Sequence, residues 1–147
     1  MGLIDDVGPG DVGIDTALFI YLIEEDTRFL ALIDPLFADA EHGKRDLVTS
    51  ALTLLEVLVV PYRAGNGALA GRYEALLLGS RGIRISDISK DQLRAAAQLR
   101  AATGVKTPDA LQLIAAISAG CSTFVTNDRR LPDIPGLRVL QLSAYTG

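Results

Sequence analysis

The stretch KTPDALQLIAAISAGCSTFVTNDRRL, residues 106–131, decides the fold. It begins with a helical pattern over 107–120 and continues as a short apolar strand over 122–127. Asp109 stands in the first turn of this helix, and Asp128 follows the strand directly. A long helix that leads into a short buried strand is typical of a crossover between parallel strands. The stretch therefore predicts a parallel sheet covered by helices.

The rest of the chain alternates short strand-like segments with longer helical ones in the same way. We expect strands at 11–15, 46–50, 83–86, 122–127 and 137–142. We expect helices at 16–26, 28–41, 51–60, 67–80, 89–104 and 107–120. The helix at 28–41 should break near Pro35, the helix at 51–60 should end at Pro61, and the helix at 67–80 should end near Gly79. Ser89 should cap the helix at 89–104 and Gly104 should end it, and Thr107 should be the N-cap of the last helix. This order predicts an α/β fold, a three-layer α/β/α sandwich around a parallel sheet of about four to five strands. We expect one domain over 1–147.

Composition narrows the function classes. Apolar residues make up 49% of the 147, which is enough for a sizeable core and excludes a disordered chain. Cys121 is the only cysteine, so no internal disulfide forms. No signal peptide and no apolar segment of the roughly 18 residues that span a bilayer is present, so we expect a cytoplasmic protein without a membrane partner. A net charge of −4 argues against a purely electrostatic nucleic-acid coat but leaves room for an enzyme that acts on nucleic acid.

Four acidic residues interrupt segments that otherwise belong to a core: Asp15, Glu56, Asp109 and Asp128. Three of them have ordinary structural explanations, because Asp15 suits an N-cap, Asp109 suits the positive end of a helix dipole, and Asp128 suits a turn. Glu56 is harder to explain, since it is the only charged residue in 51–60 and its helical neighbours are mostly apolar. An unpaired carboxylate there would cost several kcal/mol unless it reached solvent or an arginine.

All four acids fall at the carboxyl end of an expected strand or in the helix after it. Parallel strands bring these positions to one edge of the sheet, where four carboxylates repel one another unless a cation compensates. Oxygen ligands without histidine or cysteine suit Mg²⁺ or Mn²⁺. Such a site predicts hydrolysis of a phosphodiester, in which the metal activates a water and one carboxylate accepts its proton.

Spaced pieces of the sequence resemble the PIN-domain ribonucleases, and most of all the VapC-type toxins of toxin–antitoxin pairs. The pieces are GIDTALFIYLIE, TSALTLLEVL, KTPDALQLIAA and TFVTNDRRL, in that order between about Val12 and Leu142. The acidic residues of the family map onto the same four acids, Asp15, Glu56, Asp109 and Asp128, as metal ligands and catalytic residues.

The resemblance implies a metal-dependent endoribonuclease that uses Mg²⁺ or Mn²⁺, forms a homodimer and is neutralised by a cognate antitoxin. It also implies that Thr126 and Asn127 orient Asp128 or a metal-bound water, and that Thr16 acts similarly beside Asp15. Arg129 and Arg130 follow Asp128 and are candidates for RNA phosphate contacts, with a solvated charge pair as the equal alternative.

Two other functions stay open at this stage. One is a PIN-domain nuclease in RNA processing that has no antitoxin. The other is a non-catalytic interaction domain, in which Glu56 pairs with an arginine and no cation binds. The apolar residues of 30–37 and 73–79 exceed what one core face needs, so we expect a dimer interface or an antitoxin groove to use part of them.

Overall fold

The computed structural model describes residues 2–146 and contains a five-stranded parallel sheet in the order β3-β2-β1-β4-β5. The strands are β1 (Val12–Ile14), β2 (Leu47–Ser50), β3 (Ile83–Ser86), β4 (Thr123–Thr126) and β5 (Arg138–Gln141). The helices are α1 (Leu3–Asp6), α2 (Thr16–Ile23), α3 (Leu30–Glu41), α4 (Leu52–Arg63), α5 (Gly67–Gly79), α6 (Lys90–Thr103) and α7 (Thr107–Ser118), with a 3-10 turn η1 (Leu142–Tyr145). The predicted α/β class and parallel sheet are confirmed.

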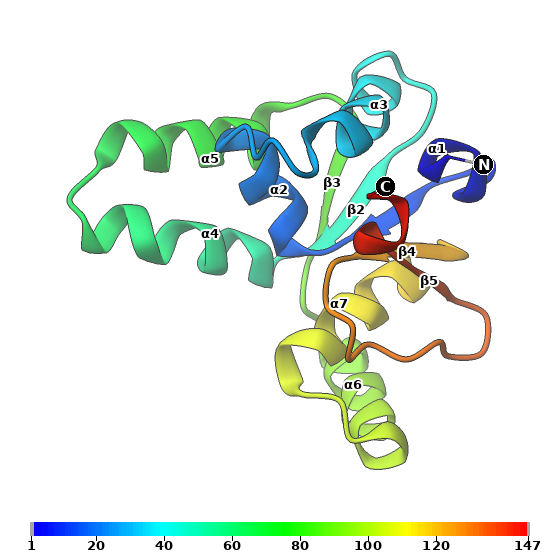
Figure 1. Cartoon of the computed structure of the whole chain (residues 1–147). Helices are drawn as coiled ribbons and strands as arrows, with labels where there is room; N and C mark the ends of the chain where they lie inside the picture. Colours follow the sequence, from blue (N-terminus) through cyan, green and yellow to red (C-terminus); the bar gives the residue numbers. More distant parts are fainter. Residues whose placement is uncertain (1, 147) are drawn as a thin grey trace.

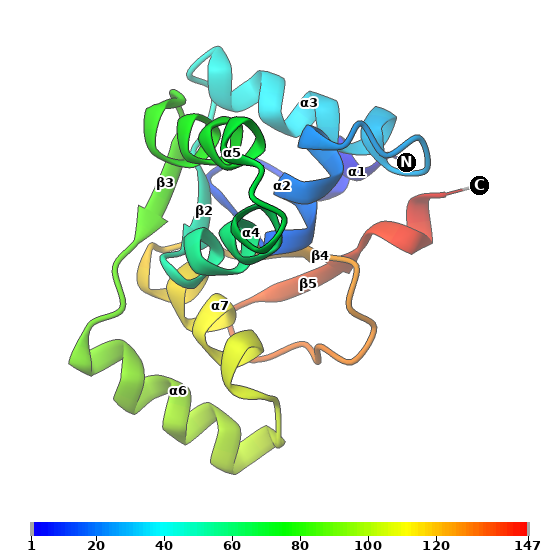
Figure 2. The same ribbon diagram turned by 90° about the vertical axis from the view of Figure 1, so that its left-hand side faces the viewer.

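Helices cover both faces of the sheet. On one face, α3 packs on β2 and α5 packs on β3, with α2 beside them. On the other face, α7 packs on β1 and β2, with α6 outside it. Figure 2 shows the two layers on opposite sides of the strands. Helices α4 and α5 form a hairpin that projects beyond the sheet (Figure 1). No helix in residues 2–146 is long and apolar enough to cross a membrane.

The strand order places a topological switch point between β1 and β4. The chain builds β1, β2 and β3 toward one edge, and then crosses back to add β4 and β5 on the other side of β1. The loops that leave β1 and β4 therefore diverge in opposite directions. In open parallel sheets the crevice at this point, beyond the carboxyl ends of the strands, is where ligands bind.

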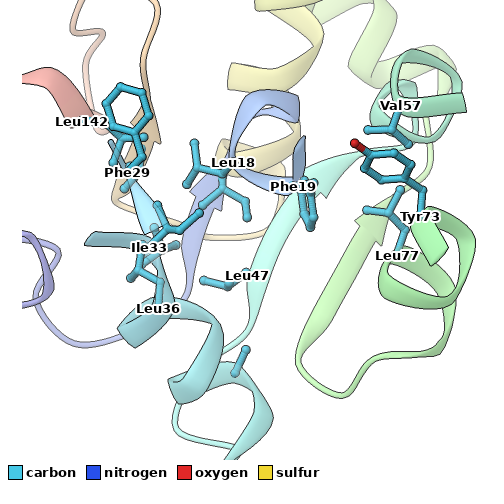
Figure 3. Packing of buried hydrophobic residues seen from close by; sticks show 14 of the residues in the cluster. Leu18, Phe19, Phe29, Ile33, Leu36, Leu47, Val57, Tyr73, Leu77 and Leu142 are labelled. Carbon is cyan, nitrogen blue, oxygen red and sulfur yellow. The ribbon is translucent and has the colours of Figure 1, made fainter. Parts of the chain in front are cut away.

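Two apolar layers hold the sheet between the helices. The larger cluster, on the side of α2 and α3, includes Leu18, Phe19 and Leu47, none of which is exposed (Figure 3). Beneath α7 the contact with β1 is very close, because a Cβ on Gly13 would lie only 2.6 Å from Cβ of Ala116. Glycine at this position therefore allows α7, and Asp109 with it, to approach the switch point.

Two expected effects of proline are wrong. Helix α3 passes Pro35 without a break. Pro35 and Ala31 are both exposed, so a proline at this position does not leave a carbonyl unpaired in the core. Helix α4 continues for two residues beyond Pro61. A proline removes only its own hydrogen bond to the residue four positions earlier, so the residues after it can still complete the last turn.

The start of α7 and the N-terminal segment also differ from expectation. Lys106 occupies the N-cap position of α7, so Thr107 and Pro108 are its first two helical residues. Proline suits the second helical position as well as the first, since the first four N–H groups of a helix have no intrahelical partner. The sequence did not indicate α1, a four-residue helix whose Leu3 is buried. The Ser89 cap and the Gly104 end of α6 are as predicted.

Candidate active site

All four predicted acids line one cavity of about 460 Å³ at the switch point. Asp15 follows β1, Glu56 lies in α4, Asp109 lies in the first turn of α7, and Asp128 follows β4 by two residues. The remaining lining residues are Thr16, Ala17, Tyr21, Pro108, Gln112, Asn127, Arg129 and Arg130. Four segments that are far apart in sequence thus meet where the strand order reverses.

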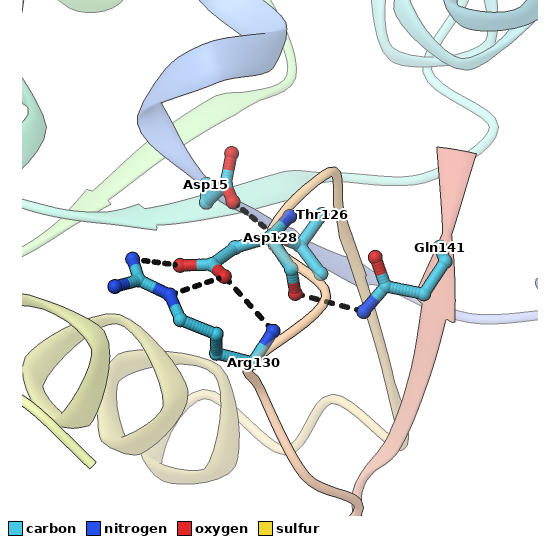
Figure 4. A network of polar contacts seen from close by, with 5 residues as sticks. All are labelled: Asp15, Thr126, Asp128, Arg130 and Gln141. Atoms are coloured by element: carbon cyan, nitrogen blue, oxygen red, sulfur yellow. Dashed lines mark hydrogen bonds and ion pairs between the residues drawn. The ribbon is translucent and has the colours of Figure 1, made fainter. Parts of the chain in front are cut away.

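Asp15 is held on both carboxylate oxygens. Oδ1 accepts a hydrogen bond of 3.0 Å from the Ala17 N–H, which makes Asp15 the N-cap of α2. Oδ2 accepts from the Thr126 hydroxyl (Figure 4). Burial raises the pKa of Asp15 to about 6; the two hydrogen bonds oppose this shift, and the negative charges of Asp109 and Asp128 add to it.

Glu56 is bound by a hydroxyl rather than by an arginine. The Thr16 hydroxyl donates to Oε1 of Glu56 at 2.7 Å, and within residues 2–146 no lysine or arginine forms an ion pair with this carboxylate. The pairing with an arginine that a non-catalytic interaction domain predicts is therefore not found in the described part of the chain.

Gln112 connects the elements around Glu56 through a buried polar network. Its Oε1 accepts from the Ser50 N–H at 3.1 Å, and its Nε2 donates to the hydroxyls of Thr53 at 2.7 Å and Thr16 at 3.3 Å. The network joins the end of β2 to α2, α4 and α7. The sequence reasoning missed Gln112; the available signal was a polar amide three positions after Asp109 on an otherwise apolar helix face.

Asp109 faces the cavity with a free carboxylate. No hydrogen bond or ion pair from the described residues reaches its side chain, although it is half-buried. Its pKa is raised first by desolvation and then by the charge of Asp128, and Glu56 adds a smaller repulsion. The positive charges of Arg130 and Lys106 oppose the shift.

Asp128 is engaged by Arg130 in a two-pronged ion pair. Nε of Arg130 lies 3.0 Å from Oδ1 and Nη2 lies 2.9 Å from Oδ2, while the Arg130 N–H also donates to Oδ1 (Figure 4). The hydrogen bonds from Arg130 hold the pKa of Asp128 below its usual value. Arg130, a predicted RNA contact, is thus occupied by an acid of the site, whereas Arg129 has no side-chain partner within residues 2–146.

The three expected supporting residues lie at the site in different ways. Besides its bond to Asp15, the Thr126 hydroxyl accepts from the Asp128 N–H at 2.9 Å, so it joins two of the acids. Thr16 contacts Glu56 instead of Asp15. Asn127 donates to the Tyr21 hydroxyl at 3.1 Å, and Tyr21 is a second cavity residue that the sequence reasoning missed.

The oxygen atoms that line the cavity are of the types that bind a hard divalent cation, but the acids are not close enough together in this structure to hold one. The cavity offers carboxylate, hydroxyl and amide oxygens, which are the ligands that Mg²⁺ and Mn²⁺ prefer. A cation among the acids would also remove the mutual repulsion that contributes to the raised pKa values of Asp15 and Asp109. Within residues 2–146, however, no three acidic, histidine or cysteine side chains are grouped closely enough to hold a metal ion. Asp128, bound by Arg130, would have to exchange that partner for a cation.

The sequence matches the PIN domain family over residues 12–137, and the chain therefore belongs to that family. Similar folds occur in a toxin–antitoxin complex from Klebsiella pneumoniae (22% identity, TM-score 0.64, 86% of this chain and 94% of that one) and in VapBC2 from Rickettsia felis bound to a promoter DNA fragment (17%, 0.66, 90% and 98%). The VapC20 toxin from Mycobacterium tuberculosis, described as cleaving the sarcin–ricin loop, is also similar (16%, 0.62, 77% and 86%). No curated protein matches the sequence.

Proposed function

We propose that this protein is a divalent-metal-dependent endoribonuclease and the toxin of a toxin–antitoxin pair. One observation carries the proposal: four acids from four separate segments line a single cavity at the switch point of a PIN-domain sheet. A purely structural role would not require all four to face the same cavity, since caps and turns form wherever a helix or loop begins. The similar folds of toxins and toxin complexes support the choice among PIN-domain functions.

Asp15, Glu56, Asp109 and Asp128 are the residues that would hold Mg²⁺ or Mn²⁺. When bound, such an ion lowers the pKa of a water and neutralises negative charge on the phosphate. Thr126 and Ala17 fix the Asp15 carboxylate, and Thr16 fixes Glu56. Asp109, whose side chain no described residue binds, is the carboxylate left free to accept a proton from the attacking water.

The partners of this function are an RNA substrate, a cognate antitoxin and a second copy of the chain, in the cytoplasm. Two of the similar structures are described as toxin–antitoxin assemblies, and this supports the antitoxin. A decisive genetic test is to express the chain alone and together with the product of a small neighbouring gene. Growth arrest that the neighbour relieves is the expected result; if expression is harmless, a processing nuclease without an antitoxin becomes the better proposal.

The enzymatic test is cleavage of RNA by the purified protein with Mg²⁺ or Mn²⁺, beside an EDTA control. Asp15→Asn and Glu56→Gln should abolish cleavage and weaken cation binding measured by calorimetry. The matched controls are Asp34→Asn and Glu74→Gln, which change exposed acids on α3 and α5 away from the cavity. They should retain both properties. A folded protein that cuts no RNA and binds no cation would refute the nuclease and favour an interaction domain.

A further inference from the structure

Two further cavities adjoin the cavity that the four acids line, which we call the acid cavity. A cavity of about 240 Å³ shares Asp109 and Arg130 with the acid cavity, and we call it the Lys106 cavity. A cavity of about 510 Å³ shares Asn127 and Arg129 with the acid cavity, and we call it the Arg28 cavity. Each neighbouring cavity thus shares two lining residues with the acid cavity, and the two pairs differ, so the acid cavity has a neighbour on each side; we call the three adjoining cavities the track.

The Lys106 cavity carries a cation beside the acids. Lys106 is the exposed N-cap residue of α7, and its ammonium group has no hydrogen-bond or ion-pair partner in the described chain. Lys106 and Asp109 line this same cavity, so the ammonium group lies beside the acid cavity. A free ammonium at this place is available to a ligand that runs out of the acid cavity.

The Arg28 cavity carries two guanidinium groups. Arg28 is held in place by Asp26, with Nε 3.1 Å from Oδ1 and Nη2 2.7 Å from Oδ2, and it lies over the ring of Phe29 at 5.0 Å. This pairing leaves Nη1 without a partner in residues 2–146. Arg129 is exposed and also has no side-chain partner in residues 2–146. It lines the same cavity, together with Ser143 and Thr146. The Thr146 hydroxyl already donates to the Ser143 carbonyl, so the guanidinium groups are the donors that suit a phosphate here.

We propose that a single strand of RNA runs through the three cavities, with the phosphates that flank the scissile one bound by Lys106 on one side and by Arg28 and Arg129 on the other. The placement of the scissile phosphate rests on the proposed function. The flanking cations answer a physical need, because the chain has a net charge of −4 and an acidic cavity that repels a polyanion. The three small cavities, of about 240, 460 and 510 Å³, suit the successive phosphates and sugars of one strand.

Recognition in the Arg28 cavity concerns the backbone of the strand. Phe29, the one aromatic residue among the described residues that line this cavity, is only 6% exposed and is stacked on Tyr21 with ring centroids 4.7 Å apart. Its ring face is thus already covered and is not a platform for a base. Contacts to phosphate and sugar position a strand without reading its sequence, so this side of the track should tolerate any nucleotide.

The test measures binding of fluorescent single-stranded oligoribonucleotides in EDTA, by anisotropy, over a series of salt concentrations and lengths. For single strands, each phosphate contact contributes about 0.7 to the slope of log affinity against log salt. The Arg28→Gln/Arg129→Gln double variant should lower the slope by about 1.4 and Lys106→Gln by about 0.7. Both variants should also gain less affinity than wild type as the oligonucleotide is lengthened.

Matched controls separate the track from general electrostatics. Arg94→Gln removes an arginine that is 72% exposed and paired with Asp91 at 2.8 Å, much as Arg28 is 70% exposed and paired with Asp26. Lys44→Gln removes a lysine that precedes β2, at the opposite end of the sheet from the acids. Both controls should keep the wild-type slope, and circular dichroism should show that every variant is folded.

The outcomes distinguish the track from the nuclease. If wild type binds RNA with the expected slopes but cleaves nothing with Mg²⁺ or Mn²⁺, the track stands and the proposed nuclease fails. If the protein cleaves RNA while the track variants bind as wild type does, the nuclease stands and the track fails. Equal losses in the control variants, or no binding of RNA at low ionic strength, would also overturn the track.

Discussion

Asp15 serves the fold and the candidate site with the same carboxylate. One oxygen caps α2 and the other accepts from Thr126 on the neighbouring strand, yet burial still raises the pKa to about 6. The folded protein therefore holds the proton of Asp15 more strongly than the unfolded chain does. Its contribution to stability is fully present below the ordinary pKa of 3.8 and is lost as the pH rises through about 6.

Asp15→Asn should stabilise the protein at pH 7 in EDTA. A pKa raised from 3.8 to about 6 corresponds to about 3 kcal/mol, and asparagine caps a helix as well as aspartate does. We expect a gain of about 1–3 kcal/mol in urea unfolding at pH 7, shrinking below pH 6 and vanishing toward pH 4. Asp34→Asn, at an exposed position, is the control and should change little. Loss of stability at pH 7 would mean that the charged form of Asp15 is needed by the fold.

Arg130→Gln should strengthen the binding of a divalent cation. The guanidinium group occupies both oxygens of Asp128, so a cation must displace it. Exposed ion pairs are weak, and removing this competitor should raise the affinity for Mn²⁺ by about two- to fivefold in calorimetry. Arg94→Gln again provides the control. Weaker binding in the Arg130 variant would indicate that the arginine positions Asp128 for the cation.

At the scale of elements, Gln112 ties α7 to the end of β2 and to the helices that carry Thr16 and Glu56. This tie explains how four segments keep their acids around one cavity although the acids repel one another. Oε1 of Gln112 is the acceptor of the buried Ser50 N–H. That N–H cannot turn to another partner as a hydroxyl can, so the amide has a specific structural role.

Gln112→Met, which keeps the side-chain length, should destabilise the protein by about 1–3 kcal/mol because the Ser50 N–H loses its acceptor in the interior. Gln98→Met on the exposed face of α6 is the matched control and should stay within about 0.5 kcal/mol of wild type. Urea unfolding measures both variants. Equal stability of the two would show that water or another group replaces the Gln112 oxygen.

At the scale of the whole molecule, most of the exposed large apolar side chains in residues 2–146 lie on the projecting hairpin, while Leu93 on α6 and Ile117 on α7 are also exposed. From the sequence we expect apolar residues of segment 30–37 to be left over for an interface. Ile33 and Leu36 of this segment are instead fully buried in the core. The exposed apolar side chains lie instead mainly on α4, where Leu55, Val59 and Tyr62 repeat at helical spacing along one face. In residues 73–79, Leu78 is exposed.

We expect this face of α4 to take part in the association of two copies. Leu55→Lys and Tyr62→Lys should each weaken dimer formation by about tenfold or more, since a charge would enter an apolar contact. Light scattering over a concentration series measures the effect, and Glu74→Gln on the same hairpin is the control. A protein that is monomeric at every concentration would contradict the dimer and leave the face to the antitoxin.

The sequence by itself determined the layered α/β fold and the four acids that line one cavity. Strand ends, the Ser89 cap and the Gly104 stop depend on near neighbours in the chain, and an acid placed after a parallel strand reaches the same edge whatever else surrounds it. Only the tertiary structure decided the partners of those acids. Thr16 contacts Glu56, which is 40 positions away, Thr126 contacts Asp15, which is 111 positions away, and Gln112 contacts Ser50, which is 62 positions away. Side chains so distant in sequence touch only after the helices have packed on both faces of the sheet.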